Sequence, residues 1–79
     1  MFPTPEQVKS YISEQLSCTH LEVEGDGQHF YATIVSPEFA GKRLVQRHQL
    51  VYAALGYRMK AEIHALSIKA FTPDEFAAQ

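Results

Sequence analysis

Four histidines are the side chains in this 79-residue chain best suited to bind a metal ion: His20, His29, His48 and His64. A neutral imidazole binds iron or zinc through one ring nitrogen, and a hydrogen bond to the other nitrogen orients the ring. One imidazole from a predicted hairpin and one from the start of the next strand can meet at a sheet edge. No CxxC pair accompanies them, so the missing ligands would have to come from a partner.

The four positions are not equivalent. His64 stands where the chain leaves a polar turn and enters an apolar strand, a place where packing does not require an imidazole. His48 falls within the apolar stripe of a predicted helix, where a half-buried, hydrogen-bonded histidine is more common than a metal ligand. The single cysteine, Cys18, is interpreted as a small half-buried residue, because no neighbouring cation or base is evident that would activate its thiol.

Charge is segregated along the chain although the net charge is only −2. Residues 1–38 carry six acids against one lysine, whereas residues 39–61 contain no acid. The cations of this basic segment are Lys42, Arg43, Arg47, Arg58 and Lys60. Two interpretations stay open: a solvated helix face, or a surface that meets an acidic partner, a phosphate or an anionic cofactor.

Several classes of function are disfavoured. The chain has no GxSxG nucleophile motif, no phosphate-binding glycine loop and no cysteine close in sequence to a histidine that would act as its base, so an independent enzyme is not expected. The N-terminus lacks the pattern of a signal peptide and no apolar run is long enough to span a membrane, which favours a reducing compartment such as the cytoplasm.

The periodicity predicts alternating helices and strands in one domain, residues 1–79. A Thr4-Pro5-Glu6-Gln7 start predicts a helix over Pro5–Leu16. Strands over Leu21–Glu24 and His29–Val35 flank a glycine-rich turn, and a helix follows over Lys42–Leu55 with Leu44, Val51 and Leu55 on its apolar stripe. A short connector over Tyr57–Glu62, a strand over Ala65–Phe71 and a final helix capped by Thr72 complete the chain.

The predicted fold class is α+β, a two-layer sandwich in αββαβα order. Two antiparallel strands precede a helical crossover, so the third strand should run parallel to the second in a three-stranded mixed sheet. This order is compatible with the second type of KH fold, but the GxxG loop that clamps nucleic acid in KH domains does not occur.

The ordered combination of three segments resembles the signature of the BolA family, FxG...RHxxVxxxL...HALxIKAxTPxEW. The segments are Phe39-Ala40-Gly41, Leu44–Leu55 with its Arg47-His48 pair, and Ile63–Phe76, in which Phe76 replaces the usual tryptophan. The hairpin GDGQHF is most similar to the short bacterial branch of acid-stress BolA paralogues. The resemblance covers nearly the whole chain.

This resemblance implies a type II KH-like fold without the GxxG loop, and a partnership with monothiol glutaredoxins. In such complexes a [2Fe-2S] cluster is shared between the glutaredoxin cysteine, glutathione and the BolA histidine that corresponds to His64. Family members often supply a second ligand from the loop between the first two strands. The aligned position here is Asp26 and the nearest imidazole is His29, so which of them serves stays open.

Two functional hypotheses follow. The first is an iron-sulfur cluster trafficking or sensing adaptor, without turnover, that is monomeric alone, carries no cofactor by itself and forms a heterodimer with a monothiol glutaredoxin. The second is a DNA-binding regulator of the stress response that uses the basic second helix, with Arg43 and Arg47 four residues apart and able to touch phosphates.

Overall fold

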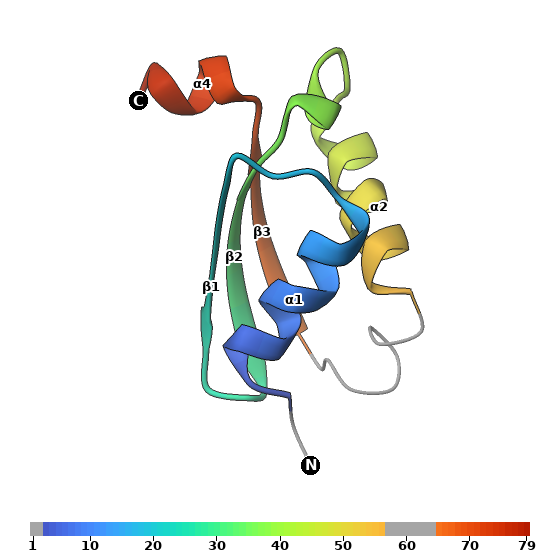
Figure 1. Ribbon diagram of the computed structural model, residues 1–79, viewed down its shortest axis with the longest axis vertical. Coiled ribbons are helices and arrows are strands. Elements are labelled where there is room, and N and C mark those ends of the chain that lie inside the picture. The colour runs from blue at the N-terminus through green and yellow to red at the C-terminus, as the bar shows by residue number, and fades with distance from the viewer. Residues whose placement is uncertain (1–2, 57–64) are drawn as a thin grey trace.

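The computed structural model describes residues 3–56 and 65–79, which form a three-stranded sheet with two longer helices on one face and a short C-terminal helix beyond its end (Figure 1). The elements are α1 (Pro5–Gln15), β1 (His20–Gly25), β2 (His29–Val35), the 3-10 helix η1 (Pro37–Phe39), α2 (Leu44–Leu55), β3 (Ala65–Phe71) and α4 (Pro73–Ala77). The α+β class and the element order are therefore as predicted. The connector predicted over 57–62 lies outside the described residues.

Reciprocal capping fixes the start of α1 and α4. The Thr4 hydroxyl accepts from the amide of Gln7 at 3.2 Å, and the Gln7 side chain accepts from the amide of Thr4 at 2.8 Å. The same pair of bonds joins Thr72 and Glu75 at the start of α4. Each reciprocal pair of hydrogen bonds, called a capping box, satisfies amides that a helix terminus would otherwise leave without partners. The proline in the first turn has no amide hydrogen and needs no such bond.

The sheet has the order β1-β2-β3, with β2 in the centre. β1 and β2 are antiparallel, and β2 and β3 are parallel, with His29 beside Ala65 and Val35 beside Phe71. The predicted mixed sheet is confirmed. The register places the start of β3 next to the start of β2 and the β1–β2 turn, at the end of the sheet opposite α4 (Figure 1).

Alternation along the strands separates a buried face from an open one. Phe30, Ala32 and Ile34 of β2 are at most 2% exposed and face the helices, whereas the exposed Tyr31 belongs to the opposite face. The core is completed from the helices and the β2–α2 connection by Val8, Ile12, Phe39, Val51 and Leu55, each fully buried. Phe39 thus fills the core from the connection between β2 and α2.

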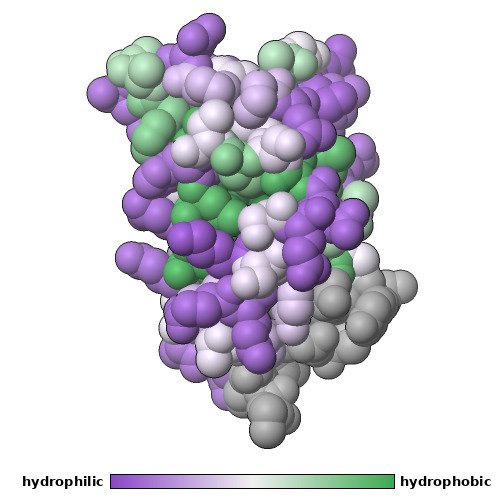
Figure 2. Space-filling model, in the orientation of Figure 1, coloured by the Kyte–Doolittle hydropathy of each residue, from purple (hydrophilic) through white to green (hydrophobic). Residues whose placement is uncertain are grey.

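The start of α2 differs from the prediction. Lys42 precedes the helix and Arg43 is its N-cap, with an extended backbone, so the helix begins at Leu44. The prediction placed Leu44 on the buried stripe with Val51 and Leu55. This is wrong for Leu44, which is 64% exposed. Arg47, one turn before Val51, takes the buried position instead. On the helix-bearing side of the molecule, hydrophobic surface lies between hydrophilic areas (Figure 2).

No helix within residues 3–56 and 65–79 is long and apolar enough to span a membrane.

Candidate functional site

The turn between β1 and β2 holds His29 at the first position of β2. One carboxylate oxygen of Asp26 accepts hydrogen bonds from the amides of Gln28 at 3.0 Å and His29 at 2.9 Å. Gly27 has a φ of 96°, a conformation that a residue with a Cβ atom rarely adopts. The short polar turn therefore fixes the backbone at His29.

The imidazole of His29 is held against the open face of the sheet by two side chains. Its Nε2 lies 2.9 Å from the hydroxyl of Ser67 on β3, and its ring stacks on Tyr31 with 4.5 Å between the centroids. When Nε2 donates its proton to Ser67, Nδ1 carries the free lone pair. A histidine that donates one N–H to an oxygen and offers its other nitrogen is the arrangement usual for metal ligands.

The β2–β3 register brings His29 to the first residue of β3, since its pairing partner is Ala65. His64 is the residue that precedes Ala65 in the chain, and it lies outside the described residues. The role of His64 therefore stays a prediction.

Asp26 is committed to the turn. The hydrogen bonds from the amides of His29 and, next, Gln28 lower the pKa of its carboxyl below the usual 3.8, so it is ionised at neutral pH. One of its oxygens already serves both amides. Within the described residues, no group of three or more His, Cys, Asp or Glu side chains is arranged to hold a metal ion. The described side chains thus supply at most part of a ligand set.

The other two described histidines are not brought to His29. His20 pairs across the sheet with Val35, at the opposite end of β2. Its Nε2 lies 2.9 Å from Glu22, and its ring stacks on Phe76 at 4.9 Å. His48 is half-buried on α2, in agreement with a structural role.

Cys18 is half-buried and its Sγ lies 3.4 Å from the carbonyl oxygen of Leu16. Burial, and secondarily the charge of Glu38, raise the pKa of its thiol. The thiolate is therefore disfavoured, and the interpretation of Cys18 as an unreactive residue is supported.

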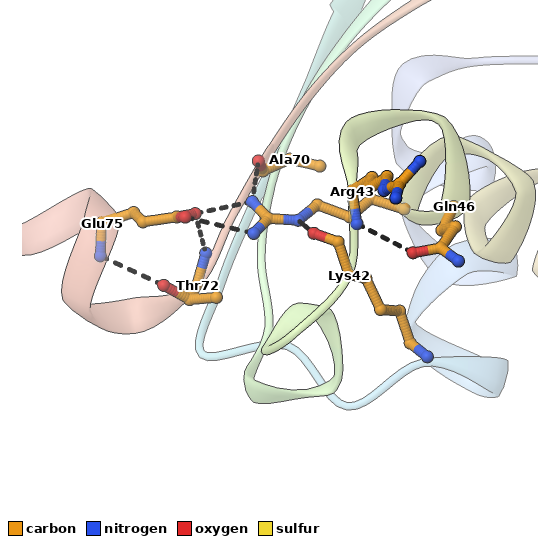
Figure 3. A network of polar contacts seen from close by, with 7 residues as sticks. Lys42, Arg43, Gln46, Ala70, Thr72 and Glu75 are labelled. Atoms are coloured by element: carbon orange, nitrogen blue, oxygen red, sulfur yellow. Dashed lines mark hydrogen bonds and ion pairs between the residues drawn. The ribbon is translucent and has the colours of Figure 1, made fainter.

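Arg47 is a correction to the predicted partner-binding surface. Only 8% of it is exposed, and its guanidinium uses four of its five N–H donors inside the fold (Figure 3). Nη1 donates to Ala70 O at 3.1 Å and to Glu75 at 2.6 Å, while Nη2 donates to Glu75 at 3.1 Å. Nε donates to Lys42 O at 2.9 Å. Arg47 therefore joins α2, β3 and α4 and is not offered to a partner.

Of the remaining predicted cations, Lys42 and Arg43 are exposed before α2, as a partner-binding role requires. Arg58 and Lys60 lie outside the described residues. Sequence reasoning missed Ser67 and Tyr31, the two side chains that orient His29. Strand alternation indicates that both leave the core, but only the parallel register shows that Ser67 reaches His29.

The comparison with family models matches residues 12–75 to BolA, described as BolA-like protein. The chain belongs to the BolA family.

Members of this family are similar to the chain over most of its length. It is 40% identical over 72 residues to the acid stress protein IbaG of Escherichia coli K12, and this alignment covers 90% of this chain and 86% of that protein. It is 42% identical over 66 residues to the DNA-binding transcriptional regulator BolA of Haemophilus influenzae, and this alignment covers 84% of this chain and 64% of the relative. The structure of a BolA homologue from Coxiella burnetii matches with a TM-score of 0.87 and 45% identity, over 95% of this chain and 97% of that one.

Proposed function

We propose that this BolA-family protein is an iron-sulfur cluster adaptor that shares a [2Fe-2S] cluster with a monothiol glutaredoxin and glutathione and has no turnover of its own. In the proposal His64 is the main ligand from this chain, and His29 is the candidate for a second. The observation that carries it is the imidazole of His29, fixed beside the first residue of β3.

The described residues fit a cluster ligated jointly with a partner better than a cluster ligated by this chain alone. The site offers the imidazole of His29, with its second nitrogen hydrogen-bonded to Ser67, and no complete ligand group among the described residues. Thiolates, the ligands that iron-sulfur clusters use most, would therefore come from the partner. Asp26 supports the site by holding the backbone of His29, and this assigns the aligned loop residue a positioning role.

Imidazole ligation explains why such a protein would act in transfer or sensing. Histidine in place of cysteine raises the reduction potential of a [2Fe-2S] centre, and a histidine is displaced by protonation near neutral pH more readily than a thiolate. The exposed Lys42 and Arg43 are available for an acidic partner surface or for the carboxylates of glutathione.

The test is to combine the chain with a monothiol glutaredoxin, glutathione, iron and sulfide, and to record the absorption and circular dichroism of the mixed cluster. We expect His64→Ala to change the spectrum strongly and His29→Ala to change it less or to shorten the life of the cluster. His20→Ala is the matched control, since His20 lies at the other end of the sheet. An unchanged spectrum for His64→Ala would show that the ligand assignment is wrong.

DNA binding is the second candidate, and the name of the Haemophilus influenzae relative favours it. The burial of Arg47 weakens it, because the described part of the basic segment then offers only Lys42 and Arg43 to phosphates. A sequence-dependent mobility shift that disappears in the double variant Lys42→Ala/Arg43→Ala would support this function. Binding that falls uniformly with modest salt would indicate phosphate attraction alone.

A further inference from the structure

One flank of α2, next to its buried stripe, carries exposed apolar side chains that the proposed cluster site does not use. Among the described residues, the large hydrophobic side chains that are exposed are Leu44 (64%), Val45 (61%) and Tyr52 (42%) on α2, and Tyr31 (55%) on the sheet. With 3.6 residues per turn, Leu44, Val45 and Tyr52 fall within about 100° around the helix axis, and the half-buried His48 lies between them. We call these four residues the α2 outer face.

Positive charge borders this face at one end. Lys42 and Arg43 are exposed directly before the helix, and residues 39–61 contain no acid. In Figure 3 the side chain of Lys42 extends away from Glu75, the acid that neutralises Arg47. The N-cap, Arg43, makes no side-chain capping hydrogen bond, because a guanidinium has donors only. The partial positive charge of the helix start therefore adds to the two cations.

The combination of apolar side chains with positive charge selects the kind of partner. We propose that the α2 outer face docks an acidic amphipathic helix of a partner protein, with its apolar side chains on Leu44, Val45 and Tyr52 and its carboxylates on Lys42 and Arg43. A helix is the occupant because a straight stripe on a helix buries most area against another helix. The inference does not depend on the proposed cluster function.

Two other occupants match this surface less well. Nucleic acid presents a dense row of phosphates, which pair with cations and not with leucine, valine or the ring of a tyrosine. The two longer helices of a second copy match less well, because the exposed residues of α1 are all polar and α2 carries the same positive charges. A helix that carries acidic and apolar side chains together is therefore better supplied by a different protein.

The start of α2, with Leu44 and Val45, lies away from His29, the described part of the candidate cluster site. α2 starts at the end of the molecule where α4 lies, since Arg47 in its first turns contacts Ala70 and Glu75. His29 lies at the other end of the sheet, next to the β1–β2 turn (Figure 1).

The experiment titrates the full chain with three synthetic peptides of about 15 residues, long enough to form a helix on docking. The first has leucines at helical spacing and glutamates elsewhere, the second is a scramble of the same composition, and the third has lysine in place of glutamate. Binding is measured by fluorescence anisotropy, and the binding surface is mapped by backbone amide chemical shifts. A DNA duplex of about 20 base pairs is titrated in parallel.

We expect the acidic amphipathic peptide to bind more tightly than the other two and to shift amides of α2. Leu44→Ser should weaken binding by about tenfold or more, since it removes a side chain that docking would bury. Lys42→Gln should weaken it several-fold, and Lys9→Gln, which removes an exposed cation of α1, should leave it unchanged. Both Leu44 and Lys42 are exposed, so far-ultraviolet circular dichroism should confirm an unchanged fold.

Three results would overturn the proposal. The first is that the acidic peptide binds no better than its scramble or its lysine version. The second is that it shifts amides of the sheet and not of α2. Alternatively, the duplex could shift the α2 amides while the acidic peptide does not, and the face would then be a nucleic-acid surface.

Discussion

At the scale of single residues, the conformation of His29 depends on Asp26. The carboxylate of Asp26 bonds to the amide of His29, and the ring of His29 is then fixed by Ser67 and Tyr31. An aspartate at the aligned loop position is therefore compatible with the proposed imidazole ligand three residues later. Its contribution is a turn that presents the histidine, whereas family members with histidine or cysteine in the loop are expected to supply the ligand directly.

The hydrogen bonds of Asp26 predict a pH dependence of the turn. These hydrogen bonds lower the pKa of Asp26 below 3.8. The carboxylate therefore accepts both bonds above pH 3.8, and they weaken as the pH falls through the lowered pKa and the group is protonated. We expect the amide proton resonances of Gln28 and His29 to stay constant down to about pH 4 and to move upfield below it. Titration by two-dimensional NMR between pH 6 and pH 2 measures this, using ~0.5-unit steps.

Asp26→Asn is the matched variant for this titration, because its amide oxygen can accept the same bonds without a charge that titrates. In this variant the amide proton resonances of Gln28 and His29 should stay constant over the pH range in which they move in the original chain. The same transition in Asp26→Asn would show that another group causes the shift.

At the scale of secondary-structure elements, Arg47 and Glu75 attach α4 to the rest of the domain. α4 has five residues and contains no buried residue, so its own packing holds it weakly. The guanidinium of Arg47 binds both oxygens of Glu75 and the carbonyl of Ala70, and lies over the ring of Phe39 at 6.0 Å. A two-bond arginine–carboxylate pair fixes orientation as well as distance, so it sets the direction in which the chain leaves β3.

This ion pair predicts how stability changes in acid. The hydrogen bonds from Arg47 and then from the Thr72 amide lower the pKa of Glu75 from 4.5 to about 2. Its contribution is therefore present above pH 4.5 and disappears as the pH falls toward about 2. We expect Glu75→Gln to lower the thermal unfolding midpoint at neutral pH, and this difference from the original chain should shrink below pH 4.5.

Thermal unfolding by circular dichroism at a series of pH values is the measurement. The control is Asp74→Asn, which removes the charge of the exposed neighbour without touching Arg47. A difference between Glu75→Gln and the original chain that is the same at every pH would contradict the role assigned to the ion pair.

At the scale of the whole molecule, one layer of helices on a small sheet leaves the opposite sheet face open. The core is accordingly thin, and a few fully buried side chains such as Phe30 and Phe39 account for much of it. A domain of this length buries only about 60% of the surface of its unfolded chain, so its stability margin is narrow. The candidate site lies on the open face, and its geometry depends on the core beneath it.

Truncation of one core ring tests how much stability this thin core supplies. Phe39→Ala should lower the free energy of unfolding by about 3–5 kcal/mol, because it removes a fully buried ring and leaves a cavity. Leu44→Ala should change it by only about 0.5 kcal/mol, since Leu44 is mostly exposed. Urea unfolding followed by circular dichroism gives both values, and equal losses in the two variants would place Leu44 in the core after all.

Much of the fold could be predicted because the signals are local. The Thr4 and Thr72 caps, the glycine turn before His29 and the alternation of Ala65–Phe71 each depend on near neighbours in the chain, and each element forms as predicted. The spacing of Val51 and Leu55 likewise identified the buried side of α2. Leu44 broke this pattern, because the first turn of α2 extends past the core and periodicity does not show where a core ends.

The sequence by itself determined the family, the αββαβα order and the turn that places His29 at a strand start, because these depend on residue types and short spacings. The tertiary structure alone decided which side chains meet across the fold. It placed Ser67 beside His29, turned Arg47 from a predicted surface cation into a buried link to Glu75, and left Leu44 and Val45 exposed. The physical reason is that strand register and helix placement join residues 28 and 38 positions apart, and no local preference encodes such contacts.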